Sequence, residues 1–314
     1  MENLLLSFTI VLPLFLSIML GYFLRRIHFF GEDQGFLKKI NSLVFHVFLP
    51  LMLFNNIYTT DLSSAFDAKL VIYTVIAVFA LFFLTITIVP IFVKAPAQKG
   101  VVEQAIFRSN SALFGLPVAI SLCGEDKLGP ISILIGLIVP IFNMMAVIVL
   151  EVNRGGKVSP LHILKEIVTN PVIIASVLGI LLNLLGVKFP AVIEKTIKDL
   201  GSVTSPLSLV ALGGFLEFKQ IGKNLKPLTV GVLGKLIISP LLFVSIGALI
   251  GFRNEYLAAL LIMFGSPAAV ASFTMAEQMG GDGELAAQLV VMTTTLSILS
   301  MFLWIFALKT LQLL

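Results

Sequence analysis

The stretch Phe107-Arg108-Ser109-Asn110-Ser111-Ala112-Leu113-Phe114-Gly115-Leu116-Pro117 lies inside an otherwise apolar run over 101–123. A helix that crosses lipid satisfies its backbone internally, so a Gly-x-Pro break beside Ser and Asn survives only where it is buried in protein or lines a cavity. A second run, over 256–279, contains Phe264-Gly265-Ser266-Pro267-Ala268-Ala269. Two interrupted membrane segments at corresponding places in two halves of a chain are typical of a transporter's binding site.

The composition predicts an all-α polytopic membrane protein. Of the 314 residues, 58% are hydrophobic and 12% are charged, and the mean hydropathy is +1.06, whereas soluble domains average about 25% charged residues. The net charge of +4 comes from Lys and Arg in short loops between apolar runs, which indicates membrane topology and disfavours nucleic-acid binding. The single cysteine, Cys123, excludes an internal disulfide and offers no metal cluster.

Apolar runs long enough to cross a bilayer, which requires about 20 residues, occur about ten times. The predicted segments cover 4–24, 36–57, 68–93, 101–123, 128–150, 161–185, 190–216, 226–251, 256–279 and 284–310. The first of them lacks a basic region and a cleavage site before Arg25, so we predict a transmembrane helix and not a signal peptide. Placing the N-terminus outside puts most Lys and Arg on the cytoplasmic side, which predicts an N-out, C-out topology.

Prolines within these segments indicate two repeats of about five segments each. The first half has Pro13, Pro50, Pro90 and Pro117, and the second half has Pro171, Pro206, Pro240 and Pro267, at offsets of 158, 156, 150 and 150. This pairing divides the chain into a first repeat over 1–150 and a second over 151–314. Because five is odd, the second repeat would enter the membrane from the opposite face, as in many secondary transporters. The alternative is that each proline only kinks its own helix.

The two breaks supply the candidate substrate-binding residues. If the fourth and ninth segments break and cross at 115–117 and 265–267, their half-helix N-termini expose unpaired N–H groups, which suit an anionic carboxylate. The candidates at the breaks and at the end of the second segment are Ser109, Asn110, Gly115, Pro117, Ser266, Pro267 and Asn55, with Asn56 beside the last. The alternative for the Ser and Asn residues is that they hold neighbouring helices together by hydrogen bonds.

Ionisable side chains at membrane depth are costly and are candidates for ion coupling or gating. Lys235 is a counter-charge for a substrate anion or a carboxylate, or it extends to the membrane surface. Glu103 and Arg108 bracket the start of the fourth segment and suggest a cytoplasmic gate, with interfacial positions as the alternative. Glu277 is either a proton carrier or a loop-edge residue.

Other polar residues in the segments are expected to support the crossing. The tenth segment carries Thr293, Thr294 and Thr295, of which Thr294 is a further coupling candidate, and the fifth segment carries Asn143. For His46, hydrogen bonds within a packed environment are favoured over a proton relay.

Short stretches over nearly the whole chain follow an order and spacing seen in one family. They are Pro13 through Gly21-Tyr22 with Arg25-Arg26, Asn41 through Leu49-Pro50, Asn110 through Gly115-Leu116-Pro117, Asn170-Pro171, Pro206 through Gly213, Ser266-Pro267 and Thr293 through Ser297. On these stretches the chain resembles a bacterial member of the auxin efflux carrier family, which includes the plant PIN-type carriers.

The resemblance implies ten helices in two inverted five-helix repeats, with a scaffold domain and a transport domain each drawn from both repeats. It also implies crossed broken helices 4 and 9, similar to those of the bile-acid sodium symporters. Pro117 and Pro267 then match the crossover prolines, Asn110 lies in the polar run before the first, and Asn55 matches the polar end of helix two. The stretch 151–165 is too short to contain the long loop of many plant carriers, which excludes regulation by phosphorylation of such a loop.

The function expected from these observations is secondary active transport of a small organic anion by alternating access, without catalysis. Bacterial relatives are often described as malate or malonate permeases, so the resemblance implies such a carboxylate or an auxin-like weak acid. It also implies a homodimer and the inner membrane of a bacterium. We expect membrane lipid as surroundings and no cofactor. The coupling ion stays open, because Glu103 and Glu277 favour H⁺ whereas the hydroxyl-rich breaks favour Na⁺.

Two other functions stay open: a non-transporting membrane sensor or scaffold that keeps the fold, and a passive channel. Enzymes are disfavoured because all aspartates fall in or near loops, His46 has no Gly-x-Ser-x-Gly partner, and no Gly-x-x-x-x-Gly-Lys-[Ser/Thr] motif occurs.

Overall fold

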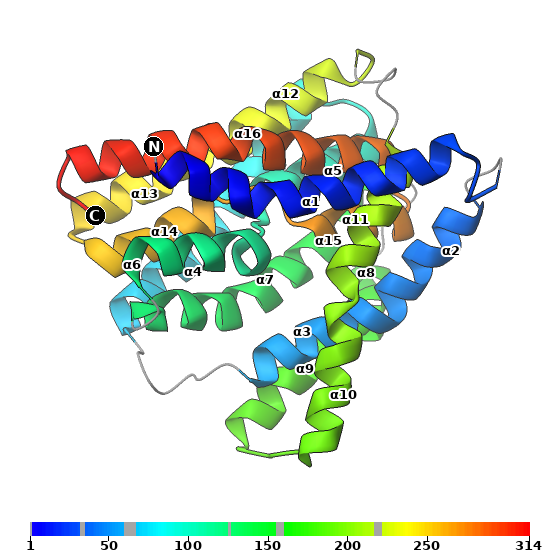
Figure 1. Cartoon of the computed structure of the whole chain (residues 1–314), viewed down its shortest axis with the longest axis horizontal. Helices are drawn as coiled ribbons and strands as arrows, with labels where there is room; N and C mark the ends of the chain where they lie inside the picture. Colours follow the sequence, from blue (N-terminus) through cyan, green and yellow to red (C-terminus); the bar gives the residue numbers. More distant parts are fainter. Residues whose placement is uncertain (1, 32–34, 60–66, 125–126, 155–159, 217–221) are drawn as a thin grey trace.

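The computed structural model describes residues 2–31, 35–59, 67–124, 127–154, 160–216 and 222–314 (Figure 1). Within these ranges the chain is helical, without strands, and one isolated antiparallel β-bridge joins Ser109 to Ala268. The helices of the first half are α1 (Glu2–Arg26), α2 (Gly35–Leu43), α3 (Leu49–Tyr58), α4 (Ala68–Phe92), α5 (Pro96–Phe107), α6 (Leu116–Cys123) and α7 (Gly129–Asn153).

The second half contains another set of helices, and short π-helical turns occur in both halves. The helices are α8 (Pro160–Thr169), α9 (Pro171–Leu184), α10 (Ala191–Ser202), α11 (Thr204–Phe215), α12 (Leu225–Leu233), α13 (Ser239–Ile250), α14 (Asn254–Gly265), α15 (Val270–Gln278) and α16 (Gly283–Thr310). The π turns are η1 (Val44–Phe48), η2 (Ser111–Gly115) and η5 (Gly234–Ile238).

Each predicted segment coincides with one helix or with a consecutive run of helices. Four predicted segments are single long helices, α1, α4, α7 and α16, and the others consist of shorter pieces. Among the described residues, five helical stretches are long and apolar enough to cross a membrane, namely Gly35–Tyr58, Ala68–Phe92, Gly129–Asn153, Leu225–Ile250 and Gly283–Thr310. Together with the shorter apolar helices, these stretches confirm the predicted class of a helical polytopic membrane protein.

The apolar outer surface agrees with this class. On α4 the side chains of Ile72, Ile76, Phe83 and Ile91 are about 60% exposed, while Val78 and Leu81 on the same helix are buried. A helix that is apolar on both its exposed and its buried face is typical of a protein surrounded by lipid.

Prolines follow directly behind the π turns. Pro50, Pro117 and Pro240 each stand two residues after the end of a π turn. A proline has no N–H to donate to the carbonyl four residues earlier, and a locally widened turn accommodates its ring. For Pro240 the carbonyl that lacks its partner is that of Leu236, and the indole Nε1 of Trp304 donates to it instead at 3.1 Å. These prolines therefore bend the helices without ending them.

The helices around α3 pack separately from those around α14. α3 packs against α9 and α10, and α1 packs against α11, whereas α14 packs against α6, α7 and α13. In Figure 1, α3, α9 and α10 gather at the lower end of the molecule, and α4, α6, α13 and α14 gather at the left. The interrupted helix α14–α15 connects the two groups, because α14 packs against α6, α7 and α13 whereas α15 packs against α16, α11 and α2.

Glycines allow the close approach of α1 and α11. A Cβ atom added to Gly21 would lie 2.0 Å from the carbonyl oxygen of Val210, and one added to Gly213 would lie 2.0 Å from that of Ile18. Small residues that let two backbones touch are a common way to hold membrane helices together. This pair of helices therefore forms a tight element beside the crossing.

Candidate functional site

The site is organised by the crossing of the two interrupted helices. α5 ends at Phe107 and is followed by Arg108, which has an extended backbone; α14 ends at Gly265 and is followed by Ser266, which is extended as well. The amide of Asn110 donates to the carbonyl of Pro267 at 2.8 Å, and the amide of Ala269 donates to the carbonyl of Arg108 at 3.3 Å. The two breaks therefore satisfy each other's backbone groups, as membrane depth requires.

The crossing was expected from the sequence, but the position of the first break was not. The prediction placed that break at Gly115-Leu116-Pro117, whereas Gly115 is helical with φ −71° and ψ −41°, and the helix continues through Pro117. The break lies at Arg108, Ser109 and Asn110 instead. The π turn closed by the amide of Gly115 on the carbonyl of Asn110 makes room for the proline ring. The pairing of Pro117 with Pro267 was therefore wrong, since only Pro267 lies in a break.

Gly115 and Ser266 hold the crossing together and do not line the cavity described below. A Cβ atom on Gly115 would lie 2.3 Å from Cγ2 of Ile262 and 3.2 Å from Oγ of Ser266. The missing side chain therefore lets the first interrupted helix touch α14. Of the predicted substrate-binding residues, Gly115, Pro117, Ser266 and Pro267 shape the crossing, whereas Ser109 and Asn110 reach the cavity.

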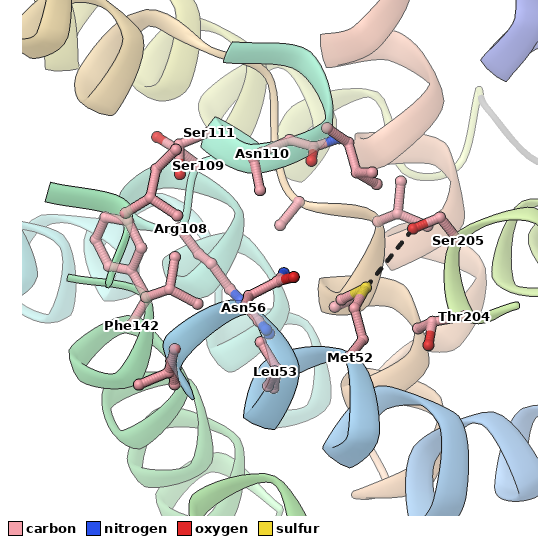
Figure 2. Close-up of a pocket in the computed structure, with 18 of the residues that line it drawn as sticks. Met52, Leu53, Asn56, Arg108, Ser109, Asn110, Ser111, Phe142, Thr204 and Ser205 are labelled. Atoms are coloured by element: carbon pink, nitrogen blue, oxygen red, sulfur yellow. Dashed lines mark hydrogen bonds between the residues drawn. The ribbon is translucent and has the colours of Figure 1, made fainter. Parts of the chain in front are cut away.

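A cavity lies between the crossing and the helices α3, α7 and α11 (Figure 2). The space between the lining atoms, including the part open to solvent, amounts to about 750 Å³. Its lining comprises Met52, Leu53, Asn56, Ile57, Arg108, Ser109, Asn110, Ser111, Ala112, Leu113, Ile135, Gly136, Val139, Phe142, Thr204, Ser205, Ser208, Ala269, Val270 and Ala271. In Figure 2, Arg108 and Phe142 lie on one side of Asn56, and Thr204 and Ser205 lie on the other.

Two helix N-termini border this cavity. The first turn of η2, over 111–113, lines it, and so do the residues 269–271 at the start of α15. The first N–H groups of a helix have no partner within that helix and carry a partial positive charge. The backbone therefore offers the cavity donors suited to an anion.

Arg108 adds a full positive charge to the same cavity. Its side chain is 3% exposed, and Nη2 donates to Oδ1 of Asn143 at 2.6 Å. In the described part of the chain no carboxylate lies within ion-pair distance of its guanidinium. A buried charge without an opposite charge is costly, so this site favours a bound anion.

The predicted gate between Glu103 and Arg108 is not present in the structure. Glu103 is buried and accepts a hydrogen bond from Nδ2 of Asn153 at 3.0 Å, away from the guanidinium. Arg108 belongs to the break because α5 ends there, which turns its side chain towards Asn143. The expected support from Asn143 is confirmed by this hydrogen bond.

Several residues that line the cavity have a buried polar atom without a hydrogen-bond partner within the described ranges. The buried side-chain atoms Nδ2 of Asn110, Oγ of Ser111 and Oγ1 of Thr204 have no hydrogen-bond partner among the described residues. Ser208 lies one turn beyond Thr204 on α11, and its hydroxyl accepts only a long contact, 3.4 Å, from Thr274. Sequence reasoning missed Thr204 and Ser208 as lining residues. Their one signal was a pair of hydroxyls four positions apart around Pro206, which places them on one face of a helix.

In two predicted groups of neighbouring polar residues, one member makes the contact. Asn56 lines the cavity, whereas Asn55 does not; neighbouring residues on a helix point about 100° apart. In the same way the hydroxyl of Thr293, and not that of Thr294, accepts the amide of Ala268 at 3.1 Å. The expectation that the tenth segment supports the crossing is confirmed at Thr293.

Lys235 and Glu277 lie in different surroundings. Lys235 is fully buried, donates to the hydroxyl of Ser109, and is not part of the cavity lining. It therefore does not extend to the membrane surface. Glu277 lies near the end of α15, where its carboxylate is 3.9 Å from the exposed ammonium of Lys38, away from the crossing. His46 contacts the carbonyl of Ser42 at 2.9 Å, which confirms the expected hydrogen bonding, but its side chain is exposed, so the expected packed environment was wrong.

Comparison with known proteins places the chain among membrane transporters. Residues 6–305 match the model of a family described as membrane transport protein. An uncharacterized transporter of Methanothermobacter thermautotrophicus is 26% identical over 94% of this chain and 96% of its own length. The uncharacterized transporter YfdV of Escherichia coli K12 is 25% identical over 85% of this chain and 87% of its own.

A third relative carries a substrate in its name. The "Putative malonate transporter" of Rhizobium meliloti is 23% identical over 92% of each chain. The family match spans nearly the whole chain, the relatives are named as transporters, and the resemblance noted in the sequence agrees with both. The protein is therefore an integral membrane protein and belongs to the membrane transport protein family, to which the auxin efflux carriers are related.

Proposed function

We propose that the protein is a secondary transporter that moves a small carboxylate anion, of the malonate or malate type, by alternating access. The observation that carries the proposal is the buried guanidinium of Arg108 at a cavity that two helix N-termini also border. One carboxylate of the substrate would contact Arg108 and the first N–H groups of η2 and α15. Charge-assisted contacts of this kind are stronger than neutral ones.

The other polar atoms of the cavity suit the rest of a dicarboxylate. The amide of Asn110 and the hydroxyls of Ser111, Thr204 and Ser205 are hydrogen-bond donors on the remaining walls. The apolar lining, with Phe142 and Ile135, is typical of a small-molecule site in which few polar groups fix orientation. The name of the relative from Rhizobium meliloti supports malonate as the first substrate to test.

The position of the cavity supports alternating access. It lies between α3 and α11 on one side and the crossing on the other. We propose that α1–α3 and α8–α11 form a scaffold, against which the helices of the crossing move. The contact between the carbonyl of Thr274 and Nδ2 of Asn41, 3.1 Å, lies on this boundary and would change as the two parts move.

We propose ten membrane crossings in two inverted repeats, with both ends of the chain outside the inner membrane. Two observations support this topology. The first residues of α1 and α8, and likewise those of α5 and α14, are 158 positions apart, as 160 minus 2 and 254 minus 96 show. In Figure 1, α1 begins and α16 ends on the same side of the molecule, as an even number of crossings requires.

Uptake of radiolabelled malonate and malate into proteoliposomes tests the transport function. Wild-type protein is assayed with a pH gradient, with a Na⁺ gradient and with neither. Saturable uptake that requires the protein supports the proposal. Flux that does not saturate indicates a channel. Binding of malonate by the purified protein without uptake indicates a sensor.

The topology is tested separately with a cysteine at the C-terminus. The only native cysteine is replaced in Cys123→Ser, and Leu314→Cys is added to that background. Labelling of intact cells by a membrane-impermeant maleimide is expected; labelling only after permeabilisation would place the C-terminus inside.

A further inference from the structure

The crossing has a second side, opposite in backbone polarity to the cavity. There α14 ends, and the last carbonyls of a helix have no partner within it and carry a partial negative charge. Side chains satisfy two of these carbonyls. The hydroxyl of Ser109 donates to the carbonyl of Met263, and the hydroxyl of Ser239 donates to that of Phe264 at 3.2 Å. Four oxygen atoms are thus gathered at the end of this helix.

Lys235 places its ammonium beside one of these oxygens, the hydroxyl of Ser109. Nζ donates to the hydroxyl of Ser109, which in turn donates to the carbonyl of Met263. Lys235 and Ser239 lie four positions apart across the π turn η5, so both face the end of α14. The side chain of Lys235 is fully enclosed, and no carboxylate of the described residues lies within ion-pair distance of its ammonium.

The attraction that Lys235 experiences therefore comes from backbone and hydroxyl dipoles. Cations are stabilised beside the C-terminal end of a helix. In transporters with broken helices, the unwound carbonyls and C-terminal half-helix ends are also the groups that coordinate Na⁺. In this chain an ammonium of the protein itself is linked to such a helix end, through the hydroxyl of Ser109 and the carbonyl of Met263.

We propose that the ammonium of Lys235 is a built-in cation, in the place where a sodium-coupled carrier of this architecture would bind Na⁺. The crossing is then complete without a metal ion, and the carrier binds and moves its anion independently of Na⁺. The claim that anion transport does not require Na⁺ rests on the proposed function. The claim that Lys235 takes the place of a bound Na⁺ rests on the contacts of Lys235 alone.

Two variants separate the space that the side chain of Lys235 fills from the charge that it carries. Lys235→Ala leaves space for an ion beside the oxygens of Ser109 and Met263. Lys235→Met fills the space but carries no charge, and buried charges replaced by apolar side chains of similar volume usually leave the fold intact. Both variants and the wild type are purified, and their thermal unfolding is measured in NaCl and in choline chloride at equal ionic strength. Malonate uptake is measured in the same salts.

For the wild type we expect the same unfolding temperature and the same uptake in both salts. For Lys235→Ala we expect NaCl to raise the unfolding temperature by about 3 °C, as for a ligand at roughly ten times its dissociation constant, and to restore part of the uptake. For Lys235→Met we expect a folded protein that does not respond to Na⁺ and whose uptake is reduced at least about 10-fold.

Three results would overturn the inference. The first is wild-type protein that Na⁺ stabilises or whose uptake requires Na⁺. The second is Lys235→Met with wild-type uptake, because the charge would then be dispensable. The third is a folded Lys235→Ala protein that shows no response to Na⁺. If Lys235→Ala does not fold, the measurements on the wild type and on Lys235→Met still test the inference. If the wild type transports neither malonate nor malate, the proposed substrate fails, while the unfolding temperatures still test the built-in cation.

Discussion

Arg108 and Lys235 are both buried cations at one crossing, yet their surroundings differ in sign. Arg108 lies on the side where two helices begin, and the partial charges of the backbone there are positive. Lys235 lies on the side where α14 ends, and the partial charges there are negative. The backbone therefore stabilises the charge of Lys235, whereas it does not stabilise that of Arg108, for which we propose a bound anion.

This difference indicates how a pair of crossed, broken helices can select anions over cations. A continuous helix has its two charged ends at the membrane surfaces, whereas a broken one brings both kinds of end to its middle. One fixed cation beside the C-terminal end neutralises that side. The other fixed cation strengthens the N-terminal side, which then favours a carboxylate.

The largest expected effect is the loss of transport in Arg108→Gln. Removing one partner of a buried, hydrogen-bonded charge pair costs roughly 2–5 kcal/mol, so malonate uptake at low concentration should fall about 100-fold. The unfolding temperature without substrate should stay the same or rise, because the protein loses a buried charge. A matching fall in both uptake and stability would assign Arg108 to the fold and contradict the comparison with Lys235.

Asn110→Ala should have an intermediate effect on the cavity side. Its Nδ2 has no partner in the described structure, and a hydrogen bond to a charged ligand group contributes about 1.5–3 kcal/mol. We expect an increase of about 10-fold or more in KM for malonate, with little change in stability. Ser239→Ala, on the other side of the crossing, is the matched control and should leave KM unchanged.

A smaller effect separates two neighbouring asparagines. Asn56 lines the cavity and Asn55 does not, so Asn56→Ala should raise KM about 5-fold, as for a hydrogen bond of about 1 kcal/mol. Asn55→Ala should behave as wild type in the same uptake assay. The reverse result would place the helix α3 in a rotated position.

The smallest effect on transport is expected for Thr293→Val. The hydroxyl of Thr293 accepts the amide of Ala268 at 3.1 Å, and leaving that buried amide unpaired costs about 1–3 kcal/mol. The unfolding temperature should fall by a few degrees, and KM should change little. Thr294→Val, one position on, serves as control, and an equal loss of stability in both variants would contradict the assigned role.

Much of the fold was readable from the sequence because lipid imposes strong local rules. Apolar runs gave the helices, and the polar stretch after Phe107 marked an interrupted helix since its backbone needs partners inside the membrane. The position of the break was not readable. Gly115 and Pro117 look like helix breakers, but a π turn accommodates the proline and the chain becomes extended at Arg108.

The candidate site was found in outline and corrected in detail. Ser109 and Asn110 were recognised because hydrogen-bonding side chains are rare in such a run. The pair Asn55 and Asn56 and the run 293–295 were recognised too, but not which member of each makes the contact. The only signal for Thr204 is the spacing of its hydroxyl from that of Ser208. Such assignments depend on the rotation of a helix, which packing against other helices determines.

The sequence by itself determined that this protein is a helical membrane protein with two interrupted segments, because hydropathy and backbone satisfaction are properties of each segment alone. Only the tertiary structure decided that the two interrupted segments are joined by the hydrogen bond between Asn110 and Pro267. It also decided on which side of the crossing Arg108 and Lys235 lie. Arg108 and Lys235 are both cationic residues in apolar runs of the sequence. Helices from distant parts of the chain place Arg108 beside two helix N-termini and Lys235 beside the C-terminal end of α14.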